Sequence, residues 1–283
     1  MTGRGRGRGK LILCGEHAVV YGHPALAFAV DRGTDAVVTA RPGPTAIDTA
    51  DGDARLATAL AAVIPPTGWS VSVRTELPVG RGMGSSAALA VALVRARAAA
   101  QGEALDDDAV FDAAMPVERA FHGNPSGLDV ALATRGGLVR FQRGPPRVVC
   151  PLPLPTWRVV VLDSGAAGDT AALVAAVAAR RPAIDPVLAR IGALAADAER
   201  HLHDPAALGE VLDDNHACLQ AIGVSTPDLD RLVALARRAG ASGAKLAGAG
   251  GGGVVLALCV DPRPLLAAAA AAGVVAWATQ PTP

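Results

Sequence analysis

The feature that most constrains this chain is a glycine-rich run at residues 78–88, P-V-G-R-G-M-G-S-S-A-A, which opens onto an alanine-rich helical pattern. Gly80, Gly82 and Gly84 stand at alternate positions, where the backbone can take positive φ and no Cβ keeps an anion from the N–H groups. The following helix adds unpaired N–H groups and the positive end of its dipole. The run therefore predicts a phosphate-binding loop at a helix N-terminus.

A structural interpretation of the same run stays open. A serine such as Ser85 or Ser86 is a common N-cap residue, and a glycine turn before it is ordinary helix-start chemistry. The spacing also fits neither the G-x-x-x-x-G-K-[ST] loop nor the G-x-G-x-x-G dinucleotide motif. The loop by itself leaves a helix cap and a phosphate site equally open.

Charge and aromatic content argue against a nucleic-acid or membrane-surface partner. The 283 residues carry 26 Lys and Arg against 26 Asp and Glu, and only 3% of residues are aromatic, so neither phosphate attraction nor base stacking is favoured. The exception is the start of the chain, where Arg4, Arg6 and Arg8 alternate with glycine. Since no aromatic residue is interleaved there, we expect residues 1–9 to form a flexible, solvated tail.

The cysteines and the hydropathy pattern favour a cytoplasmic protein. The four cysteines are scattered without C-x-x-C spacing, which predicts neither a disulfide framework nor a metal site. The sequence has no uncharged apolar run of about 18 residues and no apolar stretch directly after the N-terminal arginines. We therefore expect a protein that is neither embedded in a membrane nor exported.

Residue patterns predict strands and helices in two lobes, with a boundary at the proline-rich segment 151–155. The first lobe, 10–155, has expected strands at 10–14, 36–40, 69–75, 137–142 and 146–150, and helices at 54–63, 85–101 and 106–121. The second lobe, 156–283, has an expected strand at 157–163 and helices at 170–181, 184–203, 206–221 and 227–239. A strand, a glycine loop, a strand, a short helix and a final strand complete it.

Residues 118–129, E-R-A-F-H-G-N-P-S-G-L-D, place two carboxylates on either side of a turn. Glu118 ends one helical pattern and Asp129 begins the next. If both face one cleft, one carboxylate can hold a divalent metal and the other can act as a base. Ser126 with Asp129 three residues later also resembles a capping box, and from spacing alone capping is the stronger interpretation.

Two further segments carry unusual residues. Residues 243–253 contain six glycines in eleven positions, which predicts a second tight loop with close backbone approach. Lys10, Glu16 and His17 lie within eight positions around a predicted strand and turn. Such residues are ordinarily surface groups or a paired core histidine, but an apolar run follows them here, as at the edge of a pocket.

Together these segments resemble the GHMP kinase superfamily, and within it the mevalonate kinases. The loop at 78–88 is similar to the family pattern P-x-G-x-G-L-G-S-S-A-A, with Met83 for the usual leucine. The run K-L-A-G-A-G-G-G-G is similar to the C-terminal glycine motif, with Ala247 for the usual threonine. G-E-H-A-V-V-Y-G at 15–22 indicates the subfamily, and 122–129 and 215–225 are similar to mevalonate kinases as well.

The resemblance implies an α+β, two-lobed GHMP kinase fold. The N-terminal lobe is expected to be related to the ribosomal protein S5 domain 2-like fold, with left-handed β-α-β units, and the C-terminal lobe to be ferredoxin-like, with ATP between them. The implied reaction is phosphorylation of the C5 hydroxyl of mevalonate by ATP, giving 5-phosphomevalonate for isoprenoid synthesis. Another small-molecule GHMP kinase, for phosphomevalonate or a sugar, and a non-catalytic nucleotide-binding regulator stay open as alternatives. The sequence is compatible with a homodimer and does not settle the oligomeric state.

The resemblance also assigns roles to residues. Asp129 is implied to be the catalytic base and Lys10 to stabilise the developing charge, while Ser86 and Glu118 are implied to hold Mg²⁺. The implied ATP-binding residues are Pro78, Gly80, Arg81, Gly82, Met83, Gly84, Ser85 and Ser86. The implied mevalonate-binding residues are Glu16 and His17, with Thr170, in D-S-G-A-A-G-D-T, as a weaker candidate.

Overall fold

The computed structural model describes residues 1–49, 54–122 and 125–283 and divides them into two compact units. The first unit comprises Met1–Lys10, Asp31–Pro78 and Gly84–Gly136, and the second comprises Leu11–Val30, Val79–Met83 and Gly137–Pro283. The predicted glycine loop thus contributes to both units. Gly123 and Asn124, in the turn predicted between the two carboxylates, lie outside the described residues.

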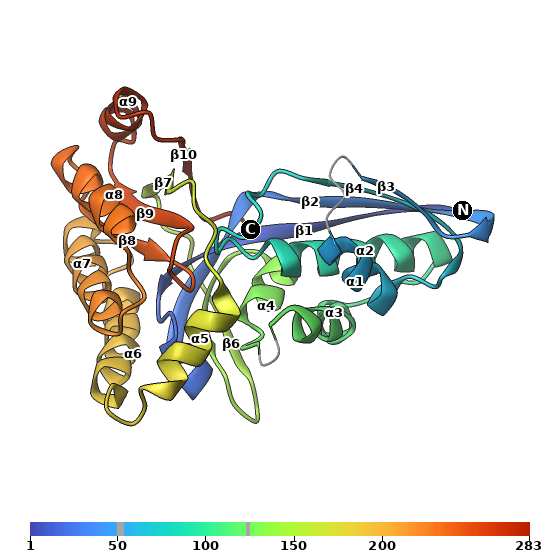
Figure 1. The fold of residues 1–283 in the computed structure, drawn as a ribbon, viewed down its shortest axis with the longest axis horizontal. Helices are drawn as coiled ribbons and strands as arrows, with labels where there is room; N and C mark the ends of the chain where they lie inside the picture. Colours follow the sequence, from blue (N-terminus) through green and yellow to red (C-terminus); the bar gives the residue numbers. More distant parts are fainter. Residues whose placement is uncertain (50–53, 123–124) are drawn as a thin grey trace. The chain divides into compact units, whose positions relative to one another are not determined.

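The first unit combines extended strands with four helices. Its strands belong to β1 (Thr2–Cys14), β2 (Pro24–Pro44), β3 (Ala46–Thr49) and β4 (Thr67–Thr75), and its helices are α1 (Ala54–Val63), α2 (Ser85–Gln101), α3 (Asp107–His122) and α4 (Leu128–Arg135). Strand β4 pairs antiparallel with β2 and parallel with β3. Figure 1 shows the four helices together on one side of these strands.

The N-terminal glycines pack strand β1 directly onto helix α2. A Cβ atom at Gly3, Gly5 or Gly7 would lie 2.1–2.2 Å from a backbone oxygen of α2. These oxygens belong to Ala96, Ala92 and Ala88, in that order. Residues 2–9 are therefore part of a strand and not the flexible tail that composition predicts. The alternating glycines serve close packing, since period-two spacing puts all of them on one face.

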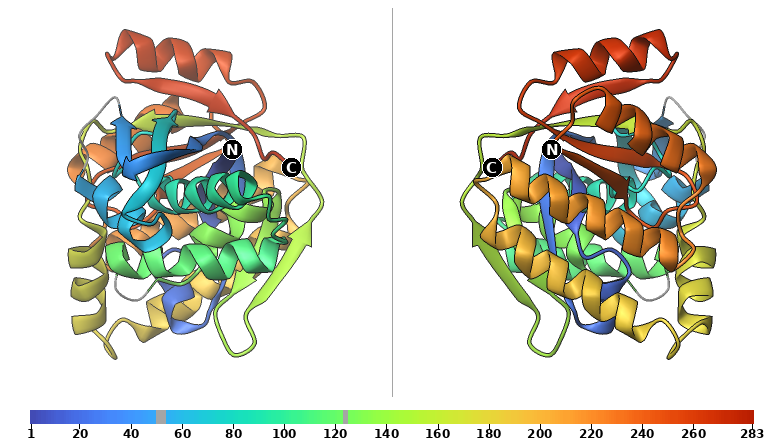
Figure 2. Two further views of the ribbon diagram at one scale, coloured as in Figure 1. Left: turned by 90° about the vertical axis from the view of Figure 1, so that its right-hand side faces the viewer. Right: turned by 90° about the vertical axis from the view of Figure 1, so that its left-hand side faces the viewer.

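The second unit contains a four-stranded antiparallel sheet in the order β10-β7-β9-β8. The strands of the second unit outside this sheet are β5 (Leu138–Gln142) and β6 (Val148–Leu152). The strands of the sheet itself are β7 (Arg158–Asp163), β8 (Gly243–Ala247), β9 (Val254–Cys259) and β10 (Ala276–Thr279). The helices of the second unit are the 3-10 turn Ala18–Tyr21, α5 (Thr170–Ala179), α6 (Asp185–Arg200), α7 (Pro205–Ala221), α8 (Pro227–Arg238) and α9 (Arg263–Ala271). Helices α6 and α7 lie side by side (Figure 2). The apolar core includes Val160, Leu219, Leu232 and Leu256, all almost completely buried.

Most predicted elements are confirmed, and α1 and α2 occupy the ranges expected from the sequence. The main omission is the first part of β2, because only residues 36–40 of that strand were predicted. Residues 25–30 are apolar without alternation and all are buried. A strand buried on both faces has no period-two signal. Among the described helices, none has the length and apolarity needed to cross a membrane.

Substituting Gly5 by alanine tests the packing of β1 on α2. The added Cβ would meet the Ala92 carbonyl oxygen at 2.2 Å, so we expect a loss of about 1–3 kcal/mol in the free energy of unfolding. Denaturant unfolding followed by circular dichroism measures this loss. The control is Arg4→Ala on the exposed side of the same strand, which should change stability by about 0.5 kcal/mol or less. Equal stabilities of Gly5→Ala and wild type would contradict the described contact.

Candidate active site

Helix α2 begins without a serine cap. Its N-cap is Gly84, at φ 72°, and no side chain caps the helix. The Ser86 hydroxyl lies instead 3.1 Å from His122 Nε2, at the end of α3. The helix-cap alternative for the glycine loop is therefore wrong, and the N–H groups of the first turn have no side chain of the helix itself as partner.

Lys10 and Asp129 form an ion pair beside this helix start. Lys10 Nζ lies 3.2 Å from Asp129 Oδ2, and the lysine side chain is only 4% exposed. A Cβ at Gly84 would lie 3.1 Å from Lys10 Cγ and 3.4 Å from Asp129 Oδ2. The ammonium group, the carboxylate and the N-terminus of α2 thus meet in one place, as the resemblance implied for Lys10 and Asp129.

The predicted capping box at the start of α4 does not form. The N-cap of α4 is Gly127, with φ 90°, and the Ser126 hydroxyl accepts the Leu128 N–H at 3.2 Å. The carboxylate of Asp129 is directed at Lys10. Ser126 therefore shapes the turn while Asp129 remains available for chemistry.

Glu118 is buried in the same region. Its side chain is 2% exposed, with Oε2 3.9 Å from His122 Nε2 and Oε1 buried without a hydrogen-bond partner. Burial and, to a lesser degree, the charge of Asp129 raise the pKa of this carboxyl to about 7, against a hydrogen bond from Ser86 and the charge of Lys10. A cation placed next to the Glu118 carboxyl would favour its ionised form.

Ser86 and Glu118 fit the requirements of a magnesium ion shared with phosphate. Mg²⁺ is commonly bound by one or two carboxylates together with substrate phosphates and water, and Glu118 Oε1 is an unused buried acceptor. In the part of the chain that the structure describes, no cluster of three or more His, Cys, Asp or Glu residues could hold a metal by itself. The residues present fit a metal that ATP brings with it.

In the second unit, the glycine-loop residues Gly80 to Met83 pack against other loops. A Cβ at Gly82 would lie 2.9 Å from the Ala247 carbonyl oxygen, in the second predicted glycine loop, and a Cβ at Gly80 would lie 3.5 Å from Ala167 Cβ. Met83 is 1% exposed. Two glycine-rich segments that are distant in sequence therefore come together, as their composition predicts.

Glu16 and His17 are tied to that second glycine loop. Glu16 Oε1 pairs with Lys245 Nζ, and both side chains are almost completely buried. His17 Nε2 lies 2.8 Å from the Ala249 carbonyl oxygen, so this nitrogen carries the proton. Burial lowers the pKa of His17, partly offset by this hydrogen bond and by Glu16. His17 also has φ 60°, an uncommon backbone conformation that is concentrated at functional sites.

Lys245 and His122 are site residues that the sequence analysis did not single out. Lys245 is 0% exposed, and its ammonium group also donates to the Leu246 and Ile12 carbonyl oxygens. Its position in the K-L-A-G-A-G-G-G-G motif was the signal available. His122 opens the H-G-N-P-S-G-L-D motif and lies one turn after Glu118.

The structure thus assembles the predicted site residues in two groups. Lys10, Gly84, Ser86, Glu118 and Asp129 come together in the first unit, which also contains Pro78 and Ser85. Glu16, His17, Gly80, Arg81, Gly82, Met83 and Thr170 belong to the second unit. Thr170 begins α5 next to the N-cap Asp169, whose carboxylate accepts the Ala172 N–H at 3.0 Å.

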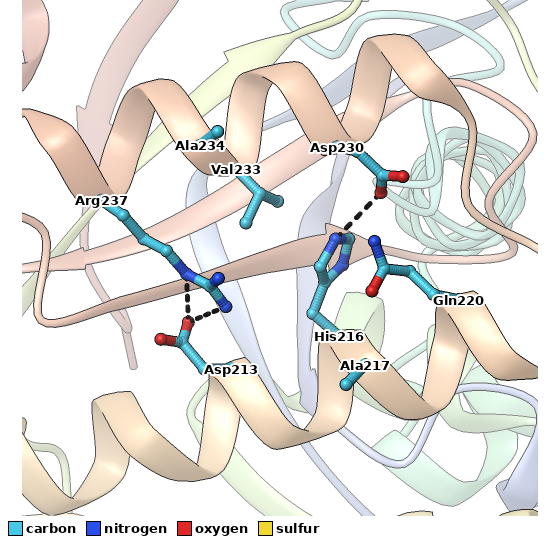
Figure 3. Close-up of a pocket in the computed structure, with 8 residues that line it drawn as sticks. All are labelled: Asp213, His216, Ala217, Gln220, Asp230, Val233, Ala234 and Arg237. Carbon is cyan, nitrogen blue, oxygen red and sulfur yellow. Dashed lines mark hydrogen bonds and ion pairs between the residues drawn. The ribbon is translucent and has the colours of Figure 1, made fainter.

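A pocket of about 140 Å³ between α7 and α8 is polar but internally paired (Figure 3). Arg237 contacts Asp213 at 2.7 Å, and His216 Nε2 lies 3.1 Å from Asp230 Oδ1. The other ring nitrogen of His216 accepts the Leu246 N–H at 3.4 Å. These bonds connect both helices to β8, the strand that leads into the second glycine loop, so the pocket has a supporting role.

Family comparisons cover both halves of the chain. Residues 54–137 match the family described as "GHMP kinases N terminal domain", and residues 191–275 match "GHMP kinases C terminal". The mevalonate kinase of Thermococcus gammatolerans is 33% identical over 92% of this chain and 90% of its own length. The mevalonate kinase of Methanothermobacter thermautotrophicus is 34% identical over 88% of each chain.

Solved structures confirm the two-lobed GHMP kinase fold. The crystal structure of L. major mevalonate kinase in complex with R-mevalonate covers 100% of this chain and 97% of its own, at 27% identity and a TM-score of 0.87. Streptococcus pneumoniae phosphomevalonate kinase covers 100% of this chain and 99% of its own, at 17% identity and a TM-score of 0.84. The fold is common to kinases with different acceptors, so fold likeness alone does not choose among them.

Glu118→Gln tests the buried carboxyl through the pH dependence of stability. A folded-state pKa of about 7, raised by burial, means that wild type loses stability as pH rises from the ordinary glutamate pKa through 7. Glutamine has no proton to lose, so the variant should gain roughly 1–3 kcal/mol relative to wild type between pH 5 and pH 8. Denaturant unfolding of metal-free protein at both pH values measures this gain. Asp112→Asn, at an exposed carboxylate of the same helix, should show no such gain, and a pH-independent difference for Glu118→Gln would contradict the assignment.

Proposed function

The chain belongs to the GHMP kinase family, and we propose that it is a mevalonate kinase, which transfers the γ-phosphoryl group of ATP to the C5 hydroxyl of mevalonate. The observation that carries the proposal is the buried Lys10–Asp129 pair at the N-terminus of α2. Identity of 33–34% to mevalonate kinases over most of the chain supports the choice of acceptor. The product is 5-phosphomevalonate.

Asp129 is the catalytic base in this proposal. Its carboxylate is 30% exposed, so the acceptor hydroxyl has access to it, whereas Lys10 is almost buried behind it. Asp129 accepts the proton of the attacking hydroxyl, and the ammonium group of Lys10 stabilises the negative charge that develops on the oxygen. Phosphoryl transfer depends mainly on positioning and charge, which a rigid, buried lysine supplies.

Ser86 and Glu118 hold Mg²⁺ in this proposal. The bound ion neutralises charge on the phosphate oxygens of ATP. Support comes from the unpartnered Glu118 Oε1 and from the repulsion between Glu118 and Asp129, which is part of the reason for the raised pKa of Glu118. A nearby cation favours the ionised form of Glu118 and leaves Asp129 to act as the base.

The remaining predicted site residues are assigned either to the nucleotide or to the acceptor. The ATP phosphates are assigned to backbone N–H groups of residues 80–86, where glycines at positive φ leave the backbone uncovered. Pro78 precedes this segment and Ser85 lies within it. Glu16 and His17 are assigned to mevalonate, with Thr170 as a further contact. The cytoplasmic location and a homodimer stay predictions.

A substrate panel tests the acceptor. Purified protein should release ADP from ATP with mevalonate, and at least about a hundredfold more slowly with phosphomevalonate, galactose or homoserine, because a site that pairs with substrate polar groups rejects ligands lacking them. A coupled ADP assay measures the rates. Preferential turnover of phosphomevalonate or a sugar would favour another GHMP kinase activity. ATP binding without turnover of any acceptor would favour a non-catalytic regulator.

Asp129→Asn tests the base. The amide keeps the shape of the side chain but cannot accept the proton, so kcat should fall by about 10²–10⁴-fold. Binding of a non-hydrolysable ATP analogue, measured by calorimetry, should change little. Asp112→Asn, at an exposed site in the same unit, serves as the matched control with wild-type kcat. A kcat of Asp129→Asn close to wild type would refute the assignment.

A further inference from the structure

Arg81 lies within the phosphate loop, but its side chain is used inside the protein. Nη2 donates to the Gly165 carbonyl oxygen at 2.8 Å, and Nε lies 3.5 Å from Asp163 Oδ1. The side chains of Arg81 and Asp163 are 19% and 15% exposed. The arginine therefore links the loop to the turn that follows β7, within one unit.

The same turn also contacts the second glycine loop through backbone groups. The Gly253 N–H donates to the Ala166 carbonyl oxygen at 2.7 Å, and the Ser164 N–H donates to the Gly253 carbonyl oxygen at 2.9 Å. A Cβ at Gly253 would lie 2.9 Å from the Arg81 carbonyl oxygen. Residues 79–83, 163–168 and 247–253 thus form a three-loop junction that leaves no room for a Cβ at Gly82, Gly168, Gly250 or Gly253.

The phosphate loop needs such an anchor. Gly80 and Gly82, on either side of Arg81, both have positive φ, and glycine loses the most conformational freedom when it is fixed. The planar guanidinium group of Arg81 contacts both the Gly165 carbonyl oxygen and Asp163. It therefore fixes the loop more firmly than a lysine would. A loop that is ordered before ATP arrives binds with a smaller entropy cost.

We propose that Arg81 is a positioning residue for ATP: through Asp163 and the Gly165 carbonyl it holds the phosphate loop in its binding geometry. The inference rests on the proposed kinase function. Direct donation from Arg81 to a phosphate oxygen is the competing role. Nη2 and Nε are already directed at the Gly165 carbonyl oxygen and the Asp163 carboxylate within the protein, which favours positioning.

The test combines Arg81→Met, Asp163→Asn and the double variant. Calorimetry measures the Kd of a magnesium complex of a non-hydrolysable ATP analogue without acceptor. Each single variant should weaken binding by about tenfold. The double variant should bind no more weakly than the weaker-binding of the two single variants, because both substitutions remove the same link. Arg81→Lys should recover only part of the affinity. Arg140→Met, which removes an exposed arginine paired with Glu199 in the same unit, is the matched control and should bind like wild type.

Two results would overturn the inference. Wild-type affinity of Arg81→Met would show that the link does not position the loop. If the affinity losses of the two single variants multiply in the double variant, Arg81 acts without Asp163, as a direct phosphate ligand does. If Arg81→Met fails to fold by circular dichroism, Arg81→Lys combined with Asp163→Asn gives the same comparison. Because binding of the ATP analogue is measured without mevalonate, this result does not depend on the outcome of the substrate panel.

Discussion

The contact of strand β1 with helix α2, without intervening side chains, fixes the geometry on which the Lys10–Asp129 pair of the first unit depends. Two strand residues span about 6.6 Å and four helical residues about 6 Å, so glycines two residues apart in β1 can face alanines four residues apart in α2. Gly5 faces Ala92 and Gly7 faces Ala88. Lys10 follows these residues in β1, and its side chain lies at the helix start, where a Cβ at Gly84 would be 3.1 Å from Lys10 Cγ.

This close packing keeps the charged side chains of Lys10, Glu118 and Asp129 near one another. Lys10, Glu118 and Asp129 give one positive and up to two negative groups in a region where Lys10 and Glu118 are almost fully buried. Burial first, and the charge of Asp129 second, raise the pKa of Glu118. A site with excess negative charge before its ligands bind is suited to receive a cation, and the adjacent N-terminus of α2 is suited to receive phosphate. The two requirements match a metal–nucleotide complex.

The sequence predicted elements better than it predicted contacts. Local patterns located α1 and α2 at their observed bounds, because helix periodicity and glycine boundaries are local signals. The strand at residues 2–9 was missed because its glycines are required by α2, more than eighty residues later. The roles of Asp129 and Glu118 came from family resemblance, since spacing alone favoured a cap. The Glu16–Lys245 pair could not be foreseen, because burial of a lysine depends on tertiary packing.

The acceptor and nucleotide motifs of the second unit are not independent. Lys245 is surrounded by three acceptors, namely Glu16 and the carbonyl oxygens of Ile12 and Leu246, so its charge is fully used inside the protein. It pairs with Glu16 in a buried position, and Glu16 Oε2 remains without a hydrogen-bond partner. His17 adds a second link through Ala249. Since kinases with different acceptors share this fold, the proposed acceptor residues Glu16 and His17 are candidates for selectivity, and their links to Lys245 and Ala249 would make acceptor binding sensitive to the second glycine loop.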